Sequence, residues 1–392
     1  MTSFFRSPTT HVVAALSITQ IIGWGATFNL PAVIGPAMGV DIGLPISAIM
    51  AGPTVMLVVI AAISWRLSTI FERRGARPVM ALGSLIGALG LSTLALAANP
   101  IIYFLAWFIL GLAGACMLTT AAQIAVKEIS GPQARQALGA LMLAGGLTST
   151  LMWPVTGILQ VQLTWRPTTL SYAALLLVVC LPLHWFVLAR HPRQPAANAQ
   201  TTARSRIDIP RFALLAATFA ANGFVTWGFS LTIIILFEAR GLTHADAIAA
   251  AALIGIAQLA ARLVDFLGSK HWSGLATALV TSLLFPASFA LLFFANGFPM
   301  AALFACLYGL AGGATAVARA TLPLEIFPSD AYARASARLA VPLNLSFAAA
   351  PPIFAAILSS AGAETALLLA LGLSSFALLC LVALFLLQRR MA

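Results

Sequence analysis

The sequence predicts an all-α integral membrane protein in which twelve transmembrane helices form two pseudo-symmetric six-helix bundles. Of its 392 residues, 61% are hydrophobic and 8% are charged, whereas about half of a soluble protein is apolar and about a quarter is charged. Apolar runs long enough to span a bilayer, roughly 20 residues each, follow one another along the chain. They lack the alternation of a membrane β-barrel, which excludes that class.

The predicted helices are apolar runs separated by short polar or charged segments. In the first half they cover residues 12–36, 45–66, 78–98, 101–126, 136–160 and 168–189. In the second half they cover 212–237, 245–267, 274–295, 299–321, 336–359 and 365–387. The polar, proline-containing stretch 190–210 predicts a flexible cytoplasmic linker. It divides the chain into an N-terminal bundle, 1–189, and a C-terminal bundle, 211–392.

Basic residues set the predicted orientation. Nearly all arginines and lysines fall in alternate loops, in the linker and near both ends of the chain, and the positive-inside rule places these segments in the cytoplasm. We therefore expect a multi-pass protein of a bacterial inner (plasma) membrane with both termini cytoplasmic. The net charge of +11 does not predict a nucleic-acid partner, because the basic residues do not gather on one soluble face.

Patterns of the first half return in the second. The charged stretch 68–77 carries an acid three residues before a glycine, and so does the stretch 261–268. The Trp-Gly pair at 24–25 returns at 227–228. Because these features recur in the same order, we interpret the chain as a tandem repeat. Halves placed in parallel are expected to share a cavity at the bilayer midplane.

The charged stretch, the twelve helices and the basic central linker resemble the major facilitator superfamily. The loop pattern of that family is Gly-x-x-x-Asp-Arg-x-Gly-x-Arg, and here it reads Ser68, Glu72, Arg73, Gly75 and Arg77. The resemblance implies a secondary transporter, symporter or antiporter, that works by alternating access. It also implies a monomer in the lipid bilayer, with a small-molecule substrate and a cavity lined by helices 1, 4, 7 and 10.

Two departures weaken a drug-antiporter interpretation within that resemblance. Trp107 stands where many drug/proton antiporters of the family carry an arginine in helix 4. The helix 5 signature Gly-Pro-x-x-Gly reads Trp153-Pro154-x-x-Gly157, so its first glycine is lost. The sequence also holds no phosphate loop, metal-ligand cluster or nucleotide fingerprint, and we expect no enzyme activity, cofactor or metal.

Arg319 is the residue that most clearly indicates chemistry. It lies inside the run 299–321 with no acid within five residues, and an arginine near the centre of a bilayer costs at least ~2.5 kcal/mol. Its guanidinium group suits a carboxylate or phosphate, which favours a substrate contact. The alternative is a structural arginine that reaches the cytoplasm or pairs with Glu325. No acid falls at a predicted helix centre, so we expect a neutral to positive cavity and an anionic or uncharged substrate.

Further substrate contacts are expected on the cavity-lining helices. Tyr308 and Thr315 share a helical face with Arg319. The other candidates lie on helices 1, 4, 5, 7 and 11, where the alternative role of small polar residues is to hold helices together. These candidates are Gln20, Trp24, Asn29, Thr119, Gln123, Trp153, Asn222, Trp227 and Asn344.

Charged residues at the predicted cytoplasmic ends are candidates for a gate that opens and closes in each cycle, because exposed ion pairs are weak, ~0–1 kcal/mol each. The gate candidates are Glu72, Arg73, Arg77, Arg135, Arg262, Asp265, Arg334 and Arg338. Proton coupling lacks an obvious carrier, and Glu238 at the outer end of helix 7 is the candidate for it. His184, in helix 6, is interpreted as structural.

The sequence therefore predicts a transporter of a small, carboxylate-like organic anion, with protons as a further partner if transport is coupled to them. The alternative is a proton-antiporting efflux transporter for amphipathic drugs or toxic metabolites, since tryptophans and phenylalanines can line a tolerant cavity. A membrane sensor or assembly factor without transport is a third hypothesis.

Overall fold

The structure is a computed structural model that describes residues 8–130, 134–188, 208–268, 274–294, 296–327 and 329–389, without some of the side chains in these ranges. The chain divides into two compact units, Met1–Ala196 (unit 1) and Ala197–Ala392 (unit 2). In the described ranges the regular structure is helical, and twelve helical segments are long and apolar enough to cross a membrane. The chain is thus an all-α membrane protein of twelve spans, as predicted.

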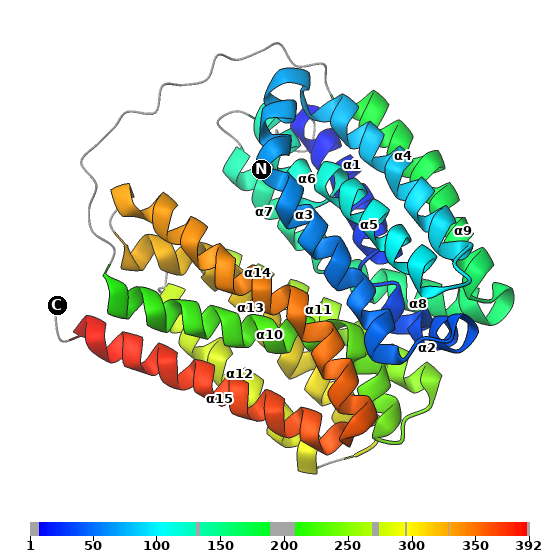
Figure 1. Ribbon diagram of the computed structural model, residues 1–392. Coiled ribbons are helices and arrows are strands. Elements are labelled where there is room, and N and C mark those ends of the chain that lie inside the picture. The colour runs from blue at the N-terminus through cyan, green and yellow to red at the C-terminus, as the bar shows by residue number, and fades with distance from the viewer. Residues whose placement is uncertain are drawn as a thin grey trace. The chain divides into compact units, whose positions relative to one another are not determined.

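Unit 1 is built from nine α-helices and two π-helical segments among its described residues. The helix α4 packs against α5 and α9, and α3 packs against α5; α1 packs against α7 and α8 (Figure 1). The elements are α1 (Pro8–Ala26), α2 (Pro31–Ile42), α3 (Ile46–Arg74), α4 (Ala76–Ala95), α5 (Pro100–Met117), α6 (Thr119–Ser130), α7 (Ala134–Gly145), α8 (Thr148–Leu163), α9 (Trp165–Leu175), η3 (Leu176–Cys180) and η4 (Leu183–Val187).

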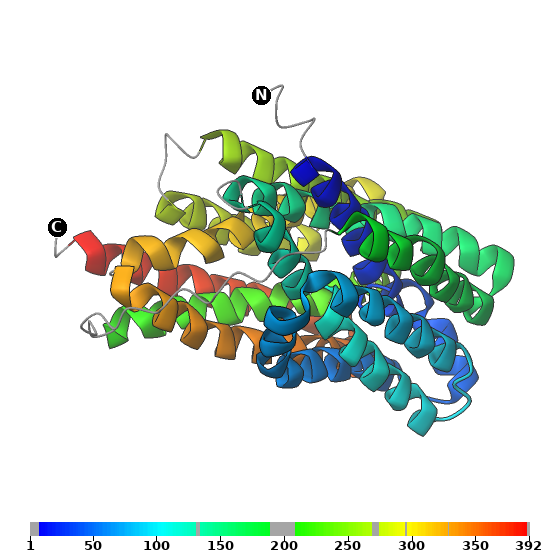
Figure 2. The same ribbon diagram turned by 90° about the horizontal axis from the view of Figure 1, so that it is seen from above.

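Unit 2 consists of six long helices in its described ranges. The helix α10 packs against both α14 and α15, and α13 packs against α11 and α12. Figure 1 and Figure 2, which view the molecule from two directions, both show α10, α14 and α15 running alongside one another. The helices are α10 (Ile209–Ala239), α11 (His244–Gly268), α12 (Gly274–Phe294), α13 (Phe298–Ile326), α14 (Ser329–Ser360) and α15 (Gly362–Arg389).

Three spans of unit 1 that the sequence predicted as single helices are interrupted. The run 12–36 breaks at residues 27–30, before Pro31, which has no N–H to continue the helix. The run 101–126 breaks at Leu118, whose φ of −86° and ψ of −157° are extended. The run 136–160 breaks after Gly145, where the N–H groups of the next two residues bond to carbonyls only three residues back instead of four. Each break leaves backbone groups that need partners.

The charged stretch 68–77 was predicted as a turn, and the structure corrects this. The helix α3 continues through Arg74, and α4 begins at Ala76. Gly75 alone is not helical, and its φ of 76° lies in a region that favours glycine. The expected helix ended too early because charged residues stop an apolar run in sequence, although a helix can extend past the membrane with a charged end.

A glutamate caps the helix that follows each charged stretch. Glu128, on α6, accepts a hydrogen bond from the N–H of Ala76 at 3.0 Å. Glu325, on α13, accepts bonds from the N–H groups of Gly274 at 2.7 Å and Leu275 at 3.2 Å. A carboxylate at a helix N-terminus satisfies exposed N–H groups and complements the helix dipole. The two units therefore use the same device to begin α4 and α12.

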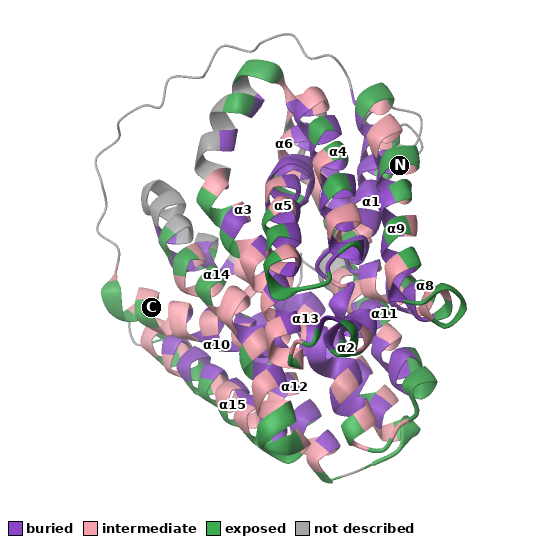
Figure 3. Ribbon diagram, turned by 45° about the vertical axis from the view of Figure 1, so that its right-hand side comes forward, coloured by how far each residue is buried: buried purple, intermediate pink, exposed green. Residues whose placement is uncertain are grey.

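Each unit buries its own apolar core, and close helix contacts at glycine support it. Buried residues line the faces that pack within a unit, while exposed residues lie on the opposite faces (Figure 3). Gly111 on α5 faces Val59 and the Met56 carbonyl of α3, and Gly309 on α13 faces the Ile254 carbonyl of α11. These sites leave no space for a side chain, in keeping with small residues at membrane helix contacts.

The linker predicted at 190–210 lies almost wholly outside the described residues, which resume at Asp208. The Asp208 side chain accepts a hydrogen bond from the Arg211 N–H at 3.3 Å. It therefore caps α10 at its first turn.

Candidate functional site

In unit 1, predicted site residues gather at the break between α5 and α6. The Gln20 side chain is buried, and its Nε2 donates a hydrogen bond to the Met117 carbonyl at 2.8 Å. The Trp24 Nε1 donates to the Thr119 hydroxyl at 3.0 Å. Side chains of α1 thus hold both sides of the break, including a carbonyl group at the end of α5. Interrupted helices inside a membrane are typical of transporter binding sites.

The other residues of unit 1 that the sequence singled out lie on several elements. Gln123 is half-buried on α6. The Asn29 Nδ2 donates to the Trp24 carbonyl at 3.2 Å and so stabilises the break after α1. Trp153 is buried on α8, and its indole N–H has no hydrogen-bond partner among the described residues. Trp107, the residue at the antiporter arginine position, is buried against Gly52 of α3.

In unit 2, Arg319 lies on α13 and is half-buried. Its Cζ stands 5.4 Å from the ring centroid of Phe347 on α14. The ring of Trp227 on α10 stacks on Phe347, with centroids 4.3 Å apart and an interplanar angle of 16°. Three helices therefore build one arrangement of a cation and two aromatic rings. Cation–π contact stabilises a desolvated guanidinium group by about 0.5–2 kcal/mol.

Arg319 forms no ion pair with any described residue. Its one hydrogen bond among the described residues is long, 3.4 Å, and runs from Nε to the Thr315 carbonyl of its own helix. The expected alternative partner, Glu325, instead caps α12. Arg262 on α11 adds like-charge repulsion at Arg319. Among the described side chains, this part of unit 2 therefore carries two positive charges, which suit an anion.

The predicted companions of Arg319 on α13 are engaged in packing. Tyr308 is buried, and its hydroxyl donates to the Thr226 carbonyl at 2.9 Å. Its ring stacks on Phe304 at 5.4 Å. Thr315 is also buried and donates to the Thr281 hydroxyl of α12 at 3.4 Å.

The remaining candidates of unit 2 differ in burial. Asn222 is buried on α10 and donates to the Ser282 hydroxyl at 3.4 Å, while its Oδ1 has no hydrogen-bond partner among the described residues. Asn344, on α14, is exposed. Asn222 thus lies in the core between α10 and α12, and Asn344 does not.

The predicted gate residues are only partly described. The side chains of Glu72, Arg135, Asp265 and Arg334 lie outside the described residues. Arg73 and Arg338 are exposed, at the end of α3 and on α14. Arg77, on the first turn of α4, lies over the Trp185 ring, with its Cζ 4.8 Å from the centroid. The gate therefore stays a prediction.

Two further titratable residues, Glu238 and His184, lie in other parts of the fold. Glu238, the candidate for proton coupling, pairs with His244 at the α10–α11 connection. His184 is buried in η4, and its Nδ1 lies 2.8 Å from the Ser84 hydroxyl of α4. A pairing of this kind fits the structural interpretation of His184. The role of Glu238 stays a prediction.

Sequence reasoning did not single out Phe347 or the break at Leu118. Phe347 is one of 24 phenylalanines, and nothing in its local sequence distinguishes it from lipid-facing ones. Leu118 has neither proline nor glycine beside it, and the break depends on Gln20 and Trp24 from another helix. The Thr119-Thr120 pair after it was the available signal, because hydroxyl side chains compete with helix hydrogen bonds.

Comparison with solved structures gives the same fold at low identity. The nucleoside transporter NupG matches with a TM-score of 0.77 and 16% identity, over 97% of this chain and 100% of that chain. A bacterial homolog of the human lysosomal transporter Spinster, inward-facing and occupied, matches with 0.72 and 16%, over 97% of each chain. The human organic anion transporter TETRAN matches with 0.67 and 16%, over 96% of this chain and 100% of that chain.

Sequence comparison with curated proteins gives no match. A family model described as Major Facilitator Superfamily matches residues 12–290. That match covers well over half of the chain, and it agrees with the twelve spans and with the folds of the solved transporters. The protein is therefore a multi-pass membrane transporter that belongs to the Major Facilitator Superfamily.

Proposed function

We propose that this transporter moves a small, carboxylate-like organic anion by alternating access and that Arg319 binds the anionic group. The observation that carries the proposal is a half-buried arginine at the end of the span Phe298–Arg319, on the Phe347 ring, with no ion pair to any described residue. Desolvating a guanidinium group is expensive. One cation–π contact offsets only part of that, so an anionic substrate is the natural remaining partner.

The positive character of the site sets the substrate class. Arg262 adds a second positive charge near Arg319, and the buried neighbours Tyr308 and Thr315 on α13 are uncharged. A neutral or cationic substrate gains nothing from this field, whereas a carboxylate forms paired bonds with the guanidinium fork. The likeness to a human organic anion transporter supports the same class.

In unit 1, the break at Leu118 supplies the polar surface that the proposal needs. Trp24 and Thr119 lie at this break, and Gln123 follows one helical turn later. We infer that these groups contact the polar part of the substrate. Proton symport needs no dedicated carboxylate in this scheme, because the substrate acid can carry the proton itself.

The proposal also includes the setting. We infer that the transporter lies in a bacterial inner membrane with both termini cytoplasmic, because the basic loops alternate along the chain. Tags at each terminus that react with an impermeant reagent in intact cells would contradict this orientation.

The test is thermal unfolding of the purified protein with panels of small organic carboxylates, neutral metabolites and lipophilic cations. A bound ligand raises stability by RT ln(1 + [L]/Kd), about 2.7 kcal/mol at one hundred times Kd. We expect carboxylates alone to stabilise the wild type, Arg319→Ala to abolish the effect, and Arg319→Lys to retain part of it. The control is Arg389→Ala, because Arg389 also lies over a phenylalanine ring, Phe385, at 4.6 Å.

The efflux alternative is favoured by one observation, the Trp227–Phe347 stack beside the cation. Paired aromatic rings bind flat apolar compounds without regard to charge. Stabilisation of the wild type and Arg319→Ala alike by lipophilic compounds would overturn the anion proposal and favour efflux.

A further inference from the structure

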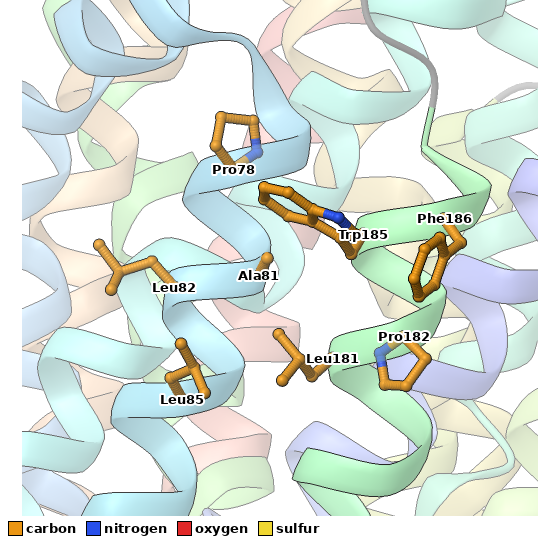
Figure 4. Close-up of a pocket in the computed structure, with 8 residues that line it drawn as sticks. All are labelled: Pro78, Ala81, Leu82, Leu85, Leu181, Pro182, Trp185 and Phe186. Carbon is orange, nitrogen blue, oxygen red and sulfur yellow. The ribbon is translucent and has the colours of Figure 1, made fainter.

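A groove on unit 1 is lined by residues to which no role in transport has been assigned. It is lined on one side by α4 between Pro78 and Leu85 and on the other by residues 181–186 (Figure 4). Its cavity volume is about 460 Å³, within the ~300–1,000 Å³ that is usual for ligand pockets. In Figure 4 the Trp185 ring points across the groove toward Pro78 and Ala81. The groove is apolar along its length and is large enough for part of a lipid chain.

The groove exists because the sixth span is not a regular α-helix. Between the π-helical segments η3 and η4 stands Pro182, which has no N–H, and the N–H of Leu181 bonds to the Leu176 carbonyl five residues back. A π-helical turn holds an extra residue and re-aims the side chains after it, and such turns are frequent at functional sites. Here they leave Phe186 78% exposed and Trp185 43% exposed beside the groove.

A cation lies beside the groove, on one of its lining residues. The Arg77 guanidinium lies over the Trp185 ring at 4.8 Å, and it forms no hydrogen bond or ion pair with another described residue. Arg74 is exposed at the end of α3 nearby in sequence, and the carboxylate of Glu128 is engaged by the Ala76 N–H. Trp and Arg at the end of a span are typical of the membrane interface, and an arginine fork matches a phosphate group.

The equivalent place in unit 2 differs among the described residues, and Lys270, which follows Gly268 as Arg77 follows Gly75, lies outside them. The helix α12 also begins at a glutamate-capped turn, but its first residues, Gly274–Thr277, carry no charge. The helix α15 has α-helical geometry from Gly362 to Arg389. Since α12 and α15 pack against each other without a π-helical segment, the fold itself does not require π-helical turns in the sixth span of unit 1.

We propose that this groove binds one anionic phospholipid, with an acyl chain along α4 and the π-helical segments and the phosphate on Arg77. The charged end of α4 is the one that the sequence predicts to face the cytoplasm, so the lipid belongs to the inner leaflet. None of the groove-lining residues is among those proposed to bind the transport substrate, and Arg77 is itself a gate candidate.

The experiment is native mass spectrometry of the full chain in neutral detergent, titrated with phosphatidylglycerol or with phosphatidylcholine of the same chains. Both lipids carry a phosphate, but the choline cation of phosphatidylcholine opposes Arg77. We therefore expect one phosphatidylglycerol bound at least about tenfold more tightly than phosphatidylcholine. Arg77→Gln is expected to remove this preference. Arg74→Gln changes the same charge outside the groove and is expected to keep it.

A second variant separates the groove from the charge. Ala81→Leu adds volume to the groove wall and leaves Arg77 in place, so we expect it to weaken both lipids at least about fivefold, in line with the loss of chain contacts. Thermal unfolding of each variant without lipid checks that it is folded. Equal loss in Arg74→Gln and Arg77→Gln, equal binding of the two lipids by the wild type, or full binding by folded Ala81→Leu would overturn the proposal. So would inorganic phosphate alone displacing the lipid.

Discussion

The two units share a plan, yet their spans differ in continuity. In unit 1 the first, fourth and fifth spans are each split into two helices, and the sixth passes into π-helical turns. The corresponding spans of unit 2, α10, α13, α14 and α15, each run unbroken for 28 residues or more. What the units keep in common is the packing at Gly111 and Gly309 and the glutamate caps on α4 and α12.

The difference in helix continuity shows which features of the repeat both units need for packing and which features differ between them. Shared features lie where helices touch or begin, and a change there disturbs packing. The breaks lie where polar groups are available to hold a freed backbone, as Gln20 does for the Met117 carbonyl. Unit 2 offers a charge instead, Arg319, on a continuous helix. The units therefore differ in the polar groups they supply: interrupted helices with freed backbone groups in unit 1, and a cationic side chain in unit 2.

The largest expected effect comes from the shared packing. Gly111→Leu and Gly309→Leu each force a side chain against the backbone of the neighbouring helix, at the Met56 and Ile254 carbonyls. Overpacking a core costs about 1–3 kcal/mol, and a backbone obstacle puts these variants at or above the upper end. We expect both to lower the midpoint of thermal unfolding in detergent by a similar amount. A large loss in one and none in the other would break the equivalence of the units.

A matched control for that pair is Gly372→Leu on α15. Nothing lies within 4 Å of a Cβ added at Gly372, and its helix is an ordinary span. We expect it to leave the midpoint unchanged or to raise it slightly, because leucine has the better helix propensity.

The next effect tests the break itself. Gln20→Leu removes the donor to the Met117 carbonyl, a buried bond of 2.8 Å, and an orphaned buried acceptor costs about 1–3 kcal/mol. Asn222→Leu removes a weaker bond of 3.4 Å to a hydroxyl that can turn elsewhere, so its cost is smaller. We expect unfolding to show this order. If Asn222→Leu were the more damaging variant, the break would not depend on Gln20.

The sequence predicted the class of fold because it rests on composition and length, which are properties of whole spans. It did not predict the break at Leu118, because the partners that hold it come from α1, some ninety residues earlier. The Gly145-Gly146 break and the Pro31 break had local signals, but glycine and proline also lie inside intact helices, such as Pro342 in α14. Whether a span breaks is decided by its neighbours.

The candidate site was predicted in part for a similar reason. Arg319 stands out in any apolar run, since its charge is costly there. The ring beneath it, Phe347, lies on a different helix and looks like other phenylalanines of the chain. Tyr308 shares the helical face of Arg319, but its hydroxyl is bonded to the Thr226 carbonyl, which helical spacing alone does not reveal.

The glutamate caps are a smaller test of what the units share. Glu128→Gln and Glu325→Gln keep an acceptor at the α4 and α12 N-termini but remove the charge that complements each helix dipole. Helix caps and dipole contacts are worth about 0.5–2 kcal/mol. We expect losses near the lower end, with the half-buried Glu128 above the exposed Glu325. Unchanged unfolding midpoints in both variants would show that the shared caps do not stabilise either unit.

The smallest expected effect concerns one exposed acidic residue in each unit, Asp41 in unit 1 and Glu238 in unit 2. Asp41 accepts bonds from the Trp165 indole at 3.0 Å and the Arg166 guanidinium at 2.9 Å, and Glu238 pairs with only His244 among the described residues. All four ionisable groups are about a third or more exposed, so each pair is worth at most ~1 kcal/mol.

We expect Asp41→Asn to lower the unfolding midpoint slightly more than Glu238→Gln, because Asp41 joins α2 to α9 through two side chains. Added salt should shrink the difference, since it screens exposed pairs. A loss in Asp41→Asn that persists in high salt would instead assign the effect to the uncharged bond from Trp165, and the contrast between the units would then be one of packing rather than charge.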